Sequence, residues 1–176
     1  KFVVVGHSMG GKVAMKLADI ARDQVEQLVV LDITPIQYHE NHHVKIFEAL
    51  FAVERANVNS RLDATKIMRE YLQEEMVIQF LLKSFNKGQW LFNVQALYNH
   101  YQDILHWKDL APVDIPALFL RGGNSFYISK PEQFAAIERQ FTHANVELIE
   151  GAGHWLHGEK PAEVLNHMQA FLDAQQ

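Results

Sequence analysis

Two hydrophobic patterns divide this chain into segments of different kinds. Short runs rich in apolar and β-branched residues occur at 2–5, 27–33, 115–120 and 145–150. Such runs predict strands, because strands buried within a parallel sheet read as near-continuous apolar segments. The first run is the clearest case and is expected to be buried on both faces. The pattern therefore predicts an α/β protein with a parallel sheet.

Helices are expected between these runs. One spans residues 13–22, so that strand, helix and strand follow one another as in the unit from which parallel sheets are built. A second has Pro131 in its first turn and Ser129 as its N-cap, and a third spans 160–171. The sheet is therefore expected to be flanked by helices.

Residues 36–114 carry a different pattern, in which apolar residues recur three or four positions apart. This spacing is typical of amphipathic helices. Asp63 is the expected N-cap of one of them, a tight turn is expected at 85–92, and a short helix follows near 94–101. We interpret the segment as a helical cap inserted between strands of a single domain that spans residues 1–176.

The first strand runs directly into Gly6-His7-Ser8-Met9-Gly10, and a helix follows. G-x-S-x-G between a strand and a helix is the pattern of the nucleophile elbow, a sharp turn that holds the serine in a strained backbone conformation. Glycines at positions 6 and 10 let the neighbouring segments approach closely. The backbone N–H of Met9 is expected to point the same way as the Ser8 hydroxyl and to form the oxyanion hole. The motif predicts a serine nucleophile.

A serine hydroxyl becomes nucleophilic when a base takes its proton, and the base needs an acid that orients it. His154 is the expected base, because it lies in the glycine-containing loop 151–155 after the last strand. This is where the chain order serine, acid, histidine places it. His157, three residues further on, is the nearest alternative.

Two residues compete for the role of the acid. Many hydrolases with this elbow carry it in a G-x-x-D pattern after the strand before the histidine strand, but that stretch reads Arg-Gly-Gly-Asn-Ser at 121–125. Asn124 can hydrogen-bond an imidazole but cannot stabilise an imidazolium by charge. Asp32 ends the strand after the elbow helix and can reach the same nitrogen from another direction. We expect Asp32 to be the orienting acid and Asn124 to support the imidazole.

The remaining candidates concern binding. Residues that flank the predicted reactive groups are expected to line the substrate pocket: His7, Asn124, Tyr127 and Trp155. The aromatic residues of the cap are interpreted mainly as its core, with one or two of them lining an acyl channel. The histidines at 39, 42 and 43 match no zinc signature in their spacing. We therefore expect no metal and no organic cofactor.

Composition narrows the class of protein further. The net charge is −5, so the chain lacks the basic footprint of a nucleic-acid-binding protein. It contains no cysteine, which excludes disulfides, a thiol nucleophile and cysteine-ligated zinc, and fits a reducing, cytoplasmic location. No apolar run approaches the roughly 18 residues of a membrane span, so no membrane partner is expected.

Several segments together resemble the YbfF-type bacterial esterases and their mitochondrial α/β-hydrolase relatives. These segments are residues 6–12, 31–35, 80–85, 122–125 and 151–155. Gly-Gly-Asn-Ser in place of G-x-x-D is the most discriminating of them. The resemblance implies an α/β-hydrolase fold with a small helical cap and a triad of Ser8, Asp32 and His154. It also implies a small-molecule substrate, either a short acyl ester or an acyl-CoA thioester.

The resemblance also raises a question about the start of the chain. An α/β hydrolase normally has several strands before its elbow, and a loop among them supplies a second oxyanion donor. We therefore expect the N-terminal strands to be missing and this chain to be the C-terminal part of a longer protein. Two alternatives to an esterase stay open: a C–C bond hydrolase on the same triad, and a non-catalytic binding protein or inactive fragment with this fold.

Overall fold

The computed structural model describes residues 1–39 and 42–174, which fall into two compact units. One unit combines Lys1–Gln37 with His106–Gln176, and the other is Tyr38–Leu105. Residues 106–114, which the hydrophobic pattern places in the insertion, group with the first unit. Within the described residues, none of the helices combines the length and apolarity needed to cross a bilayer.

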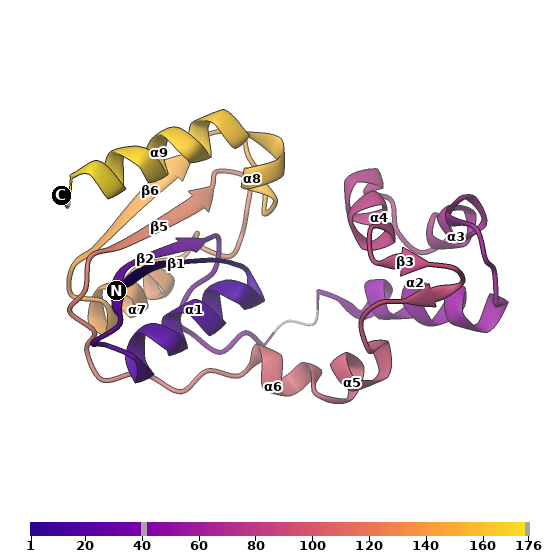
Figure 1. Ribbon diagram of the computed structural model, residues 1–176, viewed down its shortest axis with the longest axis horizontal. Coiled ribbons are helices and arrows are strands. Elements are labelled where there is room, and N and C mark those ends of the chain that lie inside the picture. Colours follow the sequence, from indigo (N-terminus) through magenta and orange to yellow (C-terminus); the bar gives the residue numbers. More distant parts are fainter. Residues whose placement is uncertain (40–41, 175–176) are drawn as a thin grey trace. The chain divides into compact units, whose positions relative to one another are not determined.

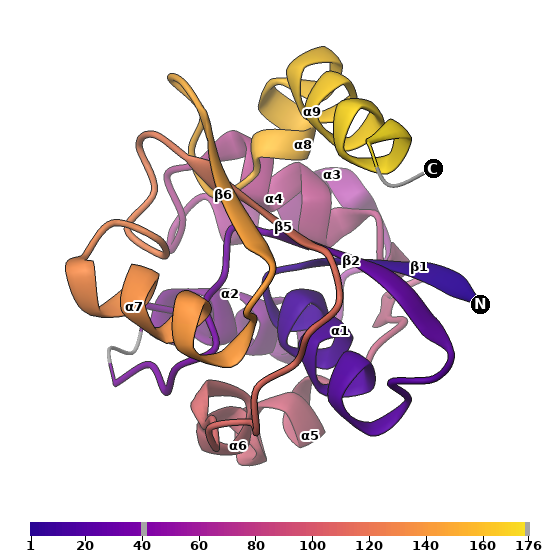
Figure 2. The ribbon, with the colours of Figure 1, turned by 90° about the vertical axis from the view of Figure 1, so that its left-hand side faces the viewer.

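The first unit is built on a parallel sheet. Its strands lie in the order β1 (Phe2–His7), β2 (Val25–Leu31), β5 (Ala117–Gly122) and β6 (Ala144–Ile149). Figure 2 shows helices on both sides of this sheet, α1 (Met9–Ile20) and α7 (Pro131–Gln140) on one and α8 (Leu156–Glu159) and α9 (Pro161–Asp173) on the other. The predicted α/β fold, a parallel sheet flanked by helices, is confirmed.

The central strand β5 explains why the apolar runs are nearly continuous. Successive side chains of a strand point to opposite faces of the sheet. Leu118 and Leu120 belong to the cluster that contains Phe171 of α9. Phe119 instead contacts Phe141, at the end of α7, with ring centroids 5.5 Å apart. Each face of β5 is therefore covered over residues 118–120, and the polar residue of the strand, Arg121, comes near its end.

The first strand differs from its prediction. β1 lies at the edge of the described sheet and pairs with β2, for example Val5 with Val29. Phe2, Val3 and Val5 are 43, 41 and 48 % exposed, respectively. The expectation of a strand buried on both faces is therefore wrong. An apolar run predicts a strand, but the order of strands in the sheet decides how much of each strand is covered.

Two predicted helix caps are also wrong. The N-cap of α7 is Lys130, and Ser129 lies outside the helix, where its backbone N–H donates to the side-chain Oε1 of Gln133 at 2.6 Å. In the second unit, the helix for which Asp63 is the expected cap is α3 (Arg61–Met68), and its N-cap is Ser60. The Ser60 hydroxyl oxygen accepts from the backbone N–H of Asp63 at 3.1 Å. In both cases the expected cap lies close to the true one. The Ser60 hydroxyl caps its helix directly, whereas at α7 the Gln133 side chain accepts from the backbone N–H of Lys130 at 2.8 Å.

The second unit is mainly helical, as its pattern predicts (Figure 1). Its helices are α2 (Val44–Ala56), α3 (Arg61–Met68), α4 (Glu75–Leu82), α5 (Val94–Asn99) and α6 (Tyr101–Leu105). The tight turn is a hairpin of β3 (Phe85–Asn86) and β4 (Gln89–Trp90). Gly88 supports the turn with a φ of 81°, a conformation that favours glycine.

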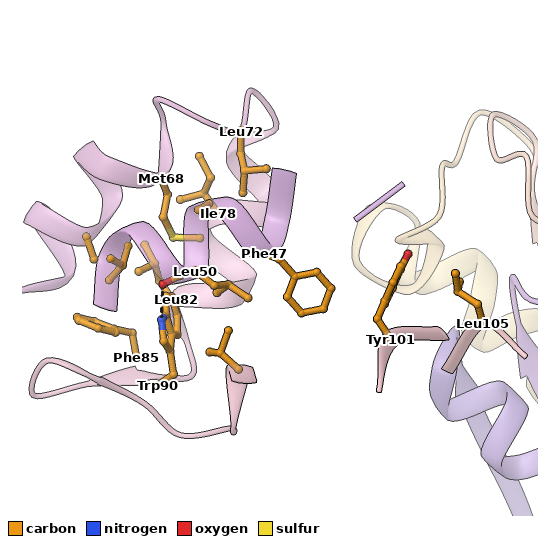
Figure 3. Close-up of a cluster of buried hydrophobic side chains, with 14 residues drawn as sticks. Phe47, Leu50, Met68, Leu72, Ile78, Leu82, Phe85, Trp90, Tyr101 and Leu105 are labelled. Carbon is orange, nitrogen blue, oxygen red and sulfur yellow. Dashed lines mark hydrogen bonds between the residues drawn. The ribbon is translucent and has the colours of Figure 1, made fainter. Parts of the chain in front are cut away.

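The second unit has a hydrophobic core of its own. Figure 3 shows Leu50, Leu82 and Trp90 in this cluster, to which α2, α3, α4 and the hairpin all contribute. The Trp90 indole N–H donates to the carbonyl of Leu50 at 3.1 Å, so the buried ring leaves no donor unsatisfied. Phe85 and Trp90 are core residues, as predicted, whereas Phe80 and Tyr98 are exposed.

Gln140, at the end of α7, holds both segments that connect the units. Its side chain is fully buried, and its Oε1 accepts from the indole N–H of Trp107 and the backbone N–H of Leu110, both at 2.9 Å. Its Nε2 donates to the carbonyl of Pro35 at 2.8 Å. Pro35 precedes the second unit and Trp107 follows it. One amide therefore ties the departing and returning segments to the first unit.

Replacing Gln140 with leucine is expected to lower the free energy of unfolding by about 3 kcal/mol, because buried donors and an acceptor lose their partners. Urea unfolding followed by circular dichroism measures this loss. The matched control is Gln169→Leu on the exposed face of α9, which is expected to change stability by less than about 0.5 kcal/mol. Equal unfolding midpoints for the two variants would contradict this account of Gln140.

Candidate active site

Ser8 sits in the turn between β1 and α1. Its φ and ψ are 55° and −122°, a conformation that costs a non-glycine residue about 1–3 kcal/mol. The turn is held by hydrogen bonds on both sides: the Ser8 N–H donates to the carbonyl of Leu31 at 3.0 Å, and the Ser8 carbonyl accepts from Gly11 at 2.8 Å. Met9 is the first residue of α1, where a backbone N–H has no partner within the helix.

The glycines around Ser8 do not all serve the same purpose. A Cβ at Gly6 would lie 2.2 Å from the carbonyl oxygen of Gly10, so only glycine fits at position 6. A Cβ at Gly10 would meet nothing within 4 Å, and the expected need for glycine there is wrong. Gly11 is the second tight position, because a Cβ there would lie 2.5 Å from the Ile33 side chain.

The structure brings His154 to Ser8 from the far end of the chain. The imidazole Nε2 lies 2.9 Å from the Ser8 Oγ, and Nδ1 lies 2.7 Å from Oδ2 of Asp32. A carboxylate only accepts hydrogen bonds, so Nδ1 carries the proton and Nε2 is free to accept from the hydroxyl. The His154 side chain keeps 19 % of its surface exposed. The ring therefore links the hydroxyl to the carboxylate and remains accessible.

Asp32 follows directly on β2, and its backbone has a φ of 53°. The residue is fully buried, and each of its carboxylate oxygens has a donor. Oδ1 accepts from the backbone N–H of Gly122 at 2.9 Å, and Oδ2 accepts from the Ser125 hydroxyl as well as from His154. These donors fix the orientation of the carboxylate.

Ser125 is the site residue that the sequence does not single out. Counted from Gly122, it is the fourth residue of Gly-Gly-Asn-Ser and holds the place of the acid in G-x-x-D. Its hydroxyl donates to Asp32 and accepts from the backbone N–H of Tyr127 at 3.2 Å. The expected support of the imidazole by Asn124 is wrong, because the Asn124 amide donates to the carbonyl of Gly151 at 3.1 Å.

The residues expected to line a substrate pocket surround His154. Tyr127 is buried and stacks on the imidazole, with ring centroids 4.1 Å apart. Trp155 lies edge-on to the same ring at 6.3 Å, and Asn124 holds the backbone of the loop. The Nε2 of His7 lies 2.8 Å from the carbonyl oxygen of His154. Tyr127, Asn124 and His7 thus contact the histidine loop, to which Trp155 itself belongs, and Tyr127 in particular limits the rotation of the imidazole.

The other candidate histidines have different surroundings. The His157 ring packs against that of His7 with centroids 4.4 Å apart, and burial lowers its pKa. His43 Nδ1 lies 2.6 Å from the Tyr101 hydroxyl, and His39 and His42 lie in the same stretch of the chain. Among the residues with described positions, no group of three or more acidic, histidine or cysteine side chains could hold a metal ion.

The loop that carries His154 packs tightly against Gly122. A Cβ at this position would lie 2.2 Å from the carbonyl oxygen of Gly153 and 2.8 Å from that of Ala152. Gly122→Ala is therefore expected to displace the loop and lower kcat on an ester substrate by roughly 10²-fold, the effect of an ångström-scale misplacement. Steady-state kinetics measure it, with Gly158→Ala as the control because nothing lies within 4 Å of its added methyl group. Unchanged kcat in Gly122→Ala would show that the loop does not need this contact.

Comparisons with known proteins show what this chain is similar to. The sequence signature described as the alpha/beta hydrolase family matches residues 1–167. The chain is 46% identical over 174 residues to Esterase YbfF of Escherichia coli (strain K12), covering 98% of this chain and 68% of that protein. It is 36% identical over 180 residues to a Mus musculus protein named sn-1-specific diacylglycerol lipase ABHD11, covering 97% of this chain and 58% of that protein.

A solved structure gives the same result. A protein described as a marine microorganism esterase has a TM-score of 0.89 and 31% sequence identity, covering 96% of this chain and 69% of that chain. Nearly all of this chain thus matches, but it spans only 58% to 69% of the length of these relatives.

Proposed function

The chain belongs to the alpha/beta hydrolase family, and from that premise we propose that it carries the reactive groups of a serine carboxylic ester hydrolase. One observation supports this above all: His154 bridges the Ser8 hydroxyl at 2.9 Å and the buried Asp32 carboxylate at 2.7 Å. This is the arrangement in which a base removes the proton of a serine while an acid holds the base in the required tautomer.

In the first half of the proposed reaction, the Ser8 Oγ attacks the carbonyl carbon of the ester, and His154 Nε2 takes the hydroxyl proton. The carbonyl oxygen becomes an oxyanion, to which the backbone N–H of Met9 donates from the start of α1. The tetrahedral intermediate then collapses as His154 returns the proton to the leaving alcohol. An acyl group remains on Ser8.

In the second half, water replaces the alcohol. His154 takes a proton from the water, the hydroxide attacks the acyl carbon, and the proton returns to Ser8 as the carboxylic acid leaves. Asp32 stays ionised and stabilises the imidazolium in both halves. The donors from Gly122 and Ser125 hold the carboxylate in place, so that its second oxygen faces Nδ1.

The substrate class follows from the chemistry and from the relatives. Relatives carry the names esterase and diacylglycerol lipase, so we propose a small-molecule carboxylic ester as the substrate. The same steps serve an acyl-CoA thioester, in which a thiol replaces the alcohol as leaving group. Parallel assays with a p-nitrophenyl ester and an acyl-CoA of equal acyl length distinguish the two.

Labelling with a fluorophosphonate tests the proposal directly. In the natural protein the reagent is expected to modify Ser8, and peptide mass spectrometry identifies the position. Ser8→Ala is the control for labelling elsewhere, and circular dichroism shows whether each sample is folded. A folded wild-type protein that stays unlabelled and hydrolyses neither substrate would overturn the proposed function.

A further inference from the structure

We infer that His7 is a positioning residue that locks the turn carrying Ser8 to the loop carrying His154. The effect of His7 on the reaction rate rests on the proposed function, whereas the hydrogen bond between His7 and the loop does not. From the sequence, His7 is expected among the pocket residues, but in the structure its ring faces the backbone of the loop that carries His154. Nε2 lies 2.8 Å from the carbonyl oxygen of His154, at a separation of 147 residues in the chain.

The hydrogen-bond partner determines the state of the His7 ring. A carbonyl oxygen only accepts, so His7 must donate through an Nε2–H group. The ring is half-buried, and burial is the main cause that lowers its pKa to about 4. His7 is therefore neutral at physiological pH, with its proton on Nε2 and aimed at the histidine loop.

This hydrogen bond closes a ring of contacts around the reactive groups. His7 and Ser8 are adjacent, and both reach the same partner: His7 bonds the His154 carbonyl at 2.8 Å, and Ser8 Oγ lies 2.9 Å from the His154 imidazole. Any displacement of the loop along the turn stretches both contacts together. His7 thereby keeps base and nucleophile at hydrogen-bonding distance while His154 exchanges its proton.

The neutral state of the His7 ring also matters for the charge that forms on His154. Its ring centroid lies 4.7 Å from that of His154 and 4.4 Å from that of His157, and the Asp32 carboxylate is the anion in this group. When His154 becomes an imidazolium, a second cation at this distance would oppose its charge. A neutral N–H donor can fix the loop without that repulsion.

Other side chains hold the flanks of the loop. The Asn124 amide donates to the carbonyl of Gly151 at 3.1 Å, and the Glu159 carboxylate accepts from the backbone N–H of Gly153 at 2.9 Å. The side chains of Asn124, Glu159 and His7 thus hydrogen-bond the backbone of this loop. Of these, His7 bonds residue 154 itself. Removing it is therefore expected to leave the loop folded and to affect the alignment of the imidazole.

Three variants test this role kinetically. His7→Leu removes the donor, and we expect kcat to fall roughly 10- to 100-fold with KM changed less than about threefold. His7→Gln keeps a neutral N–H donor and is expected to recover most of the lost kcat. His143→Leu, an exposed histidine before β6, is the control. Wild-type kcat in His7→Leu, an effect on KM alone, or equal losses in His7→Leu and His7→Gln would each overturn the inference.

A spectroscopic test does not depend on activity. In ¹⁵N-labelled protein, long-range ¹H–¹⁵N correlation of imidazole nitrogens is expected to show His7 as the Nε2–H tautomer from pH 8 to pH 5, with protonation near pH 4. The His7→Gln spectrum assigns the signals. An Nδ1–H tautomer, or titration near the ordinary value of 6.5, would overturn the inference. Absence of turnover in the wild type would count against the proposed function only. The tautomer and titration of His7 seen by NMR would then still test the proposed positioning role.

Discussion

A Ser8→Ala variant is expected to hydrolyse ester substrates about 10⁶-fold more slowly than the wild type, the scale seen when a triad nucleophile is removed. The reason is chemical, because no other hydroxyl of the described residues is bonded to the His154 imidazole. Without Ser8 no acyl-enzyme forms, and only binding and the oxyanion donor remain. Steady-state kinetics on a p-nitrophenyl ester measure the loss.

The control for Ser8→Ala is Ser84→Ala, a serine of the second unit whose backbone carbonyl, retained in alanine, bonds to Leu91. Its kcat is expected to stay at the wild-type value. Both variants should give the same circular dichroism spectrum as the wild type, since each removes a single oxygen atom. Residual turnover above about 1% in Ser8→Ala would mean that a different residue attacks the ester.

Asp32→Asn is expected to lower kcat by about 10⁴-fold, as loss of the acid does in a Ser-His-Asp triad. The amide removes the negative charge that stabilises the imidazolium. It also presents an N–H₂ group to His154 Nδ1, which favours the tautomer with its proton on Nε2, where it cannot accept from Ser8. The carboxylate is fully buried, so water cannot take over its role.

Comparison with two neighbours sharpens this test. Asn124→Ala is expected to lower kcat less than about tenfold, because its amide holds loop backbone and does not touch the imidazole. Ser125→Ala removes one of the donors to Asp32, and an effect between the other two is expected. Equal losses in Asp32→Asn and Asn124→Ala, or a larger loss in the second, would overturn the assignment of the acid.

Much of this site can be predicted from the sequence, because local residue types dictate the turn. An apolar run, Gly6, Ser8 and a helix are enough to predict an elbow that exposes a hydroxyl, and its strained φ of 55° is observed. Chain order then points to His154 and Asp32, since residues after the ends of parallel strands lie at one edge of the sheet. The approach of Gly6 to Gly10 is likewise a local consequence of the turn.

The remaining features depend on how distant segments pack. Ser125 reaches Asp32 across 93 residues, and His7 reaches His154 across 147, so no local pattern distinguishes them from Asn124 or from a pocket residue. The same holds for the exposure of β1, which follows from its place at the edge of the described sheet.

The sequence alone thus determined the type of fold, the nucleophile turn and the candidate base and acid. These depend on periodicity, turn chemistry and chain order, which are written within a few residues or in their succession. Only the tertiary structure decided which hydrogen bonds hold the Asp32 carboxylate and align the His154 imidazole. Those bonds depend on strand order and loop paths, and a shift of one residue, as from Asn124 to Ser125, changes the partner completely.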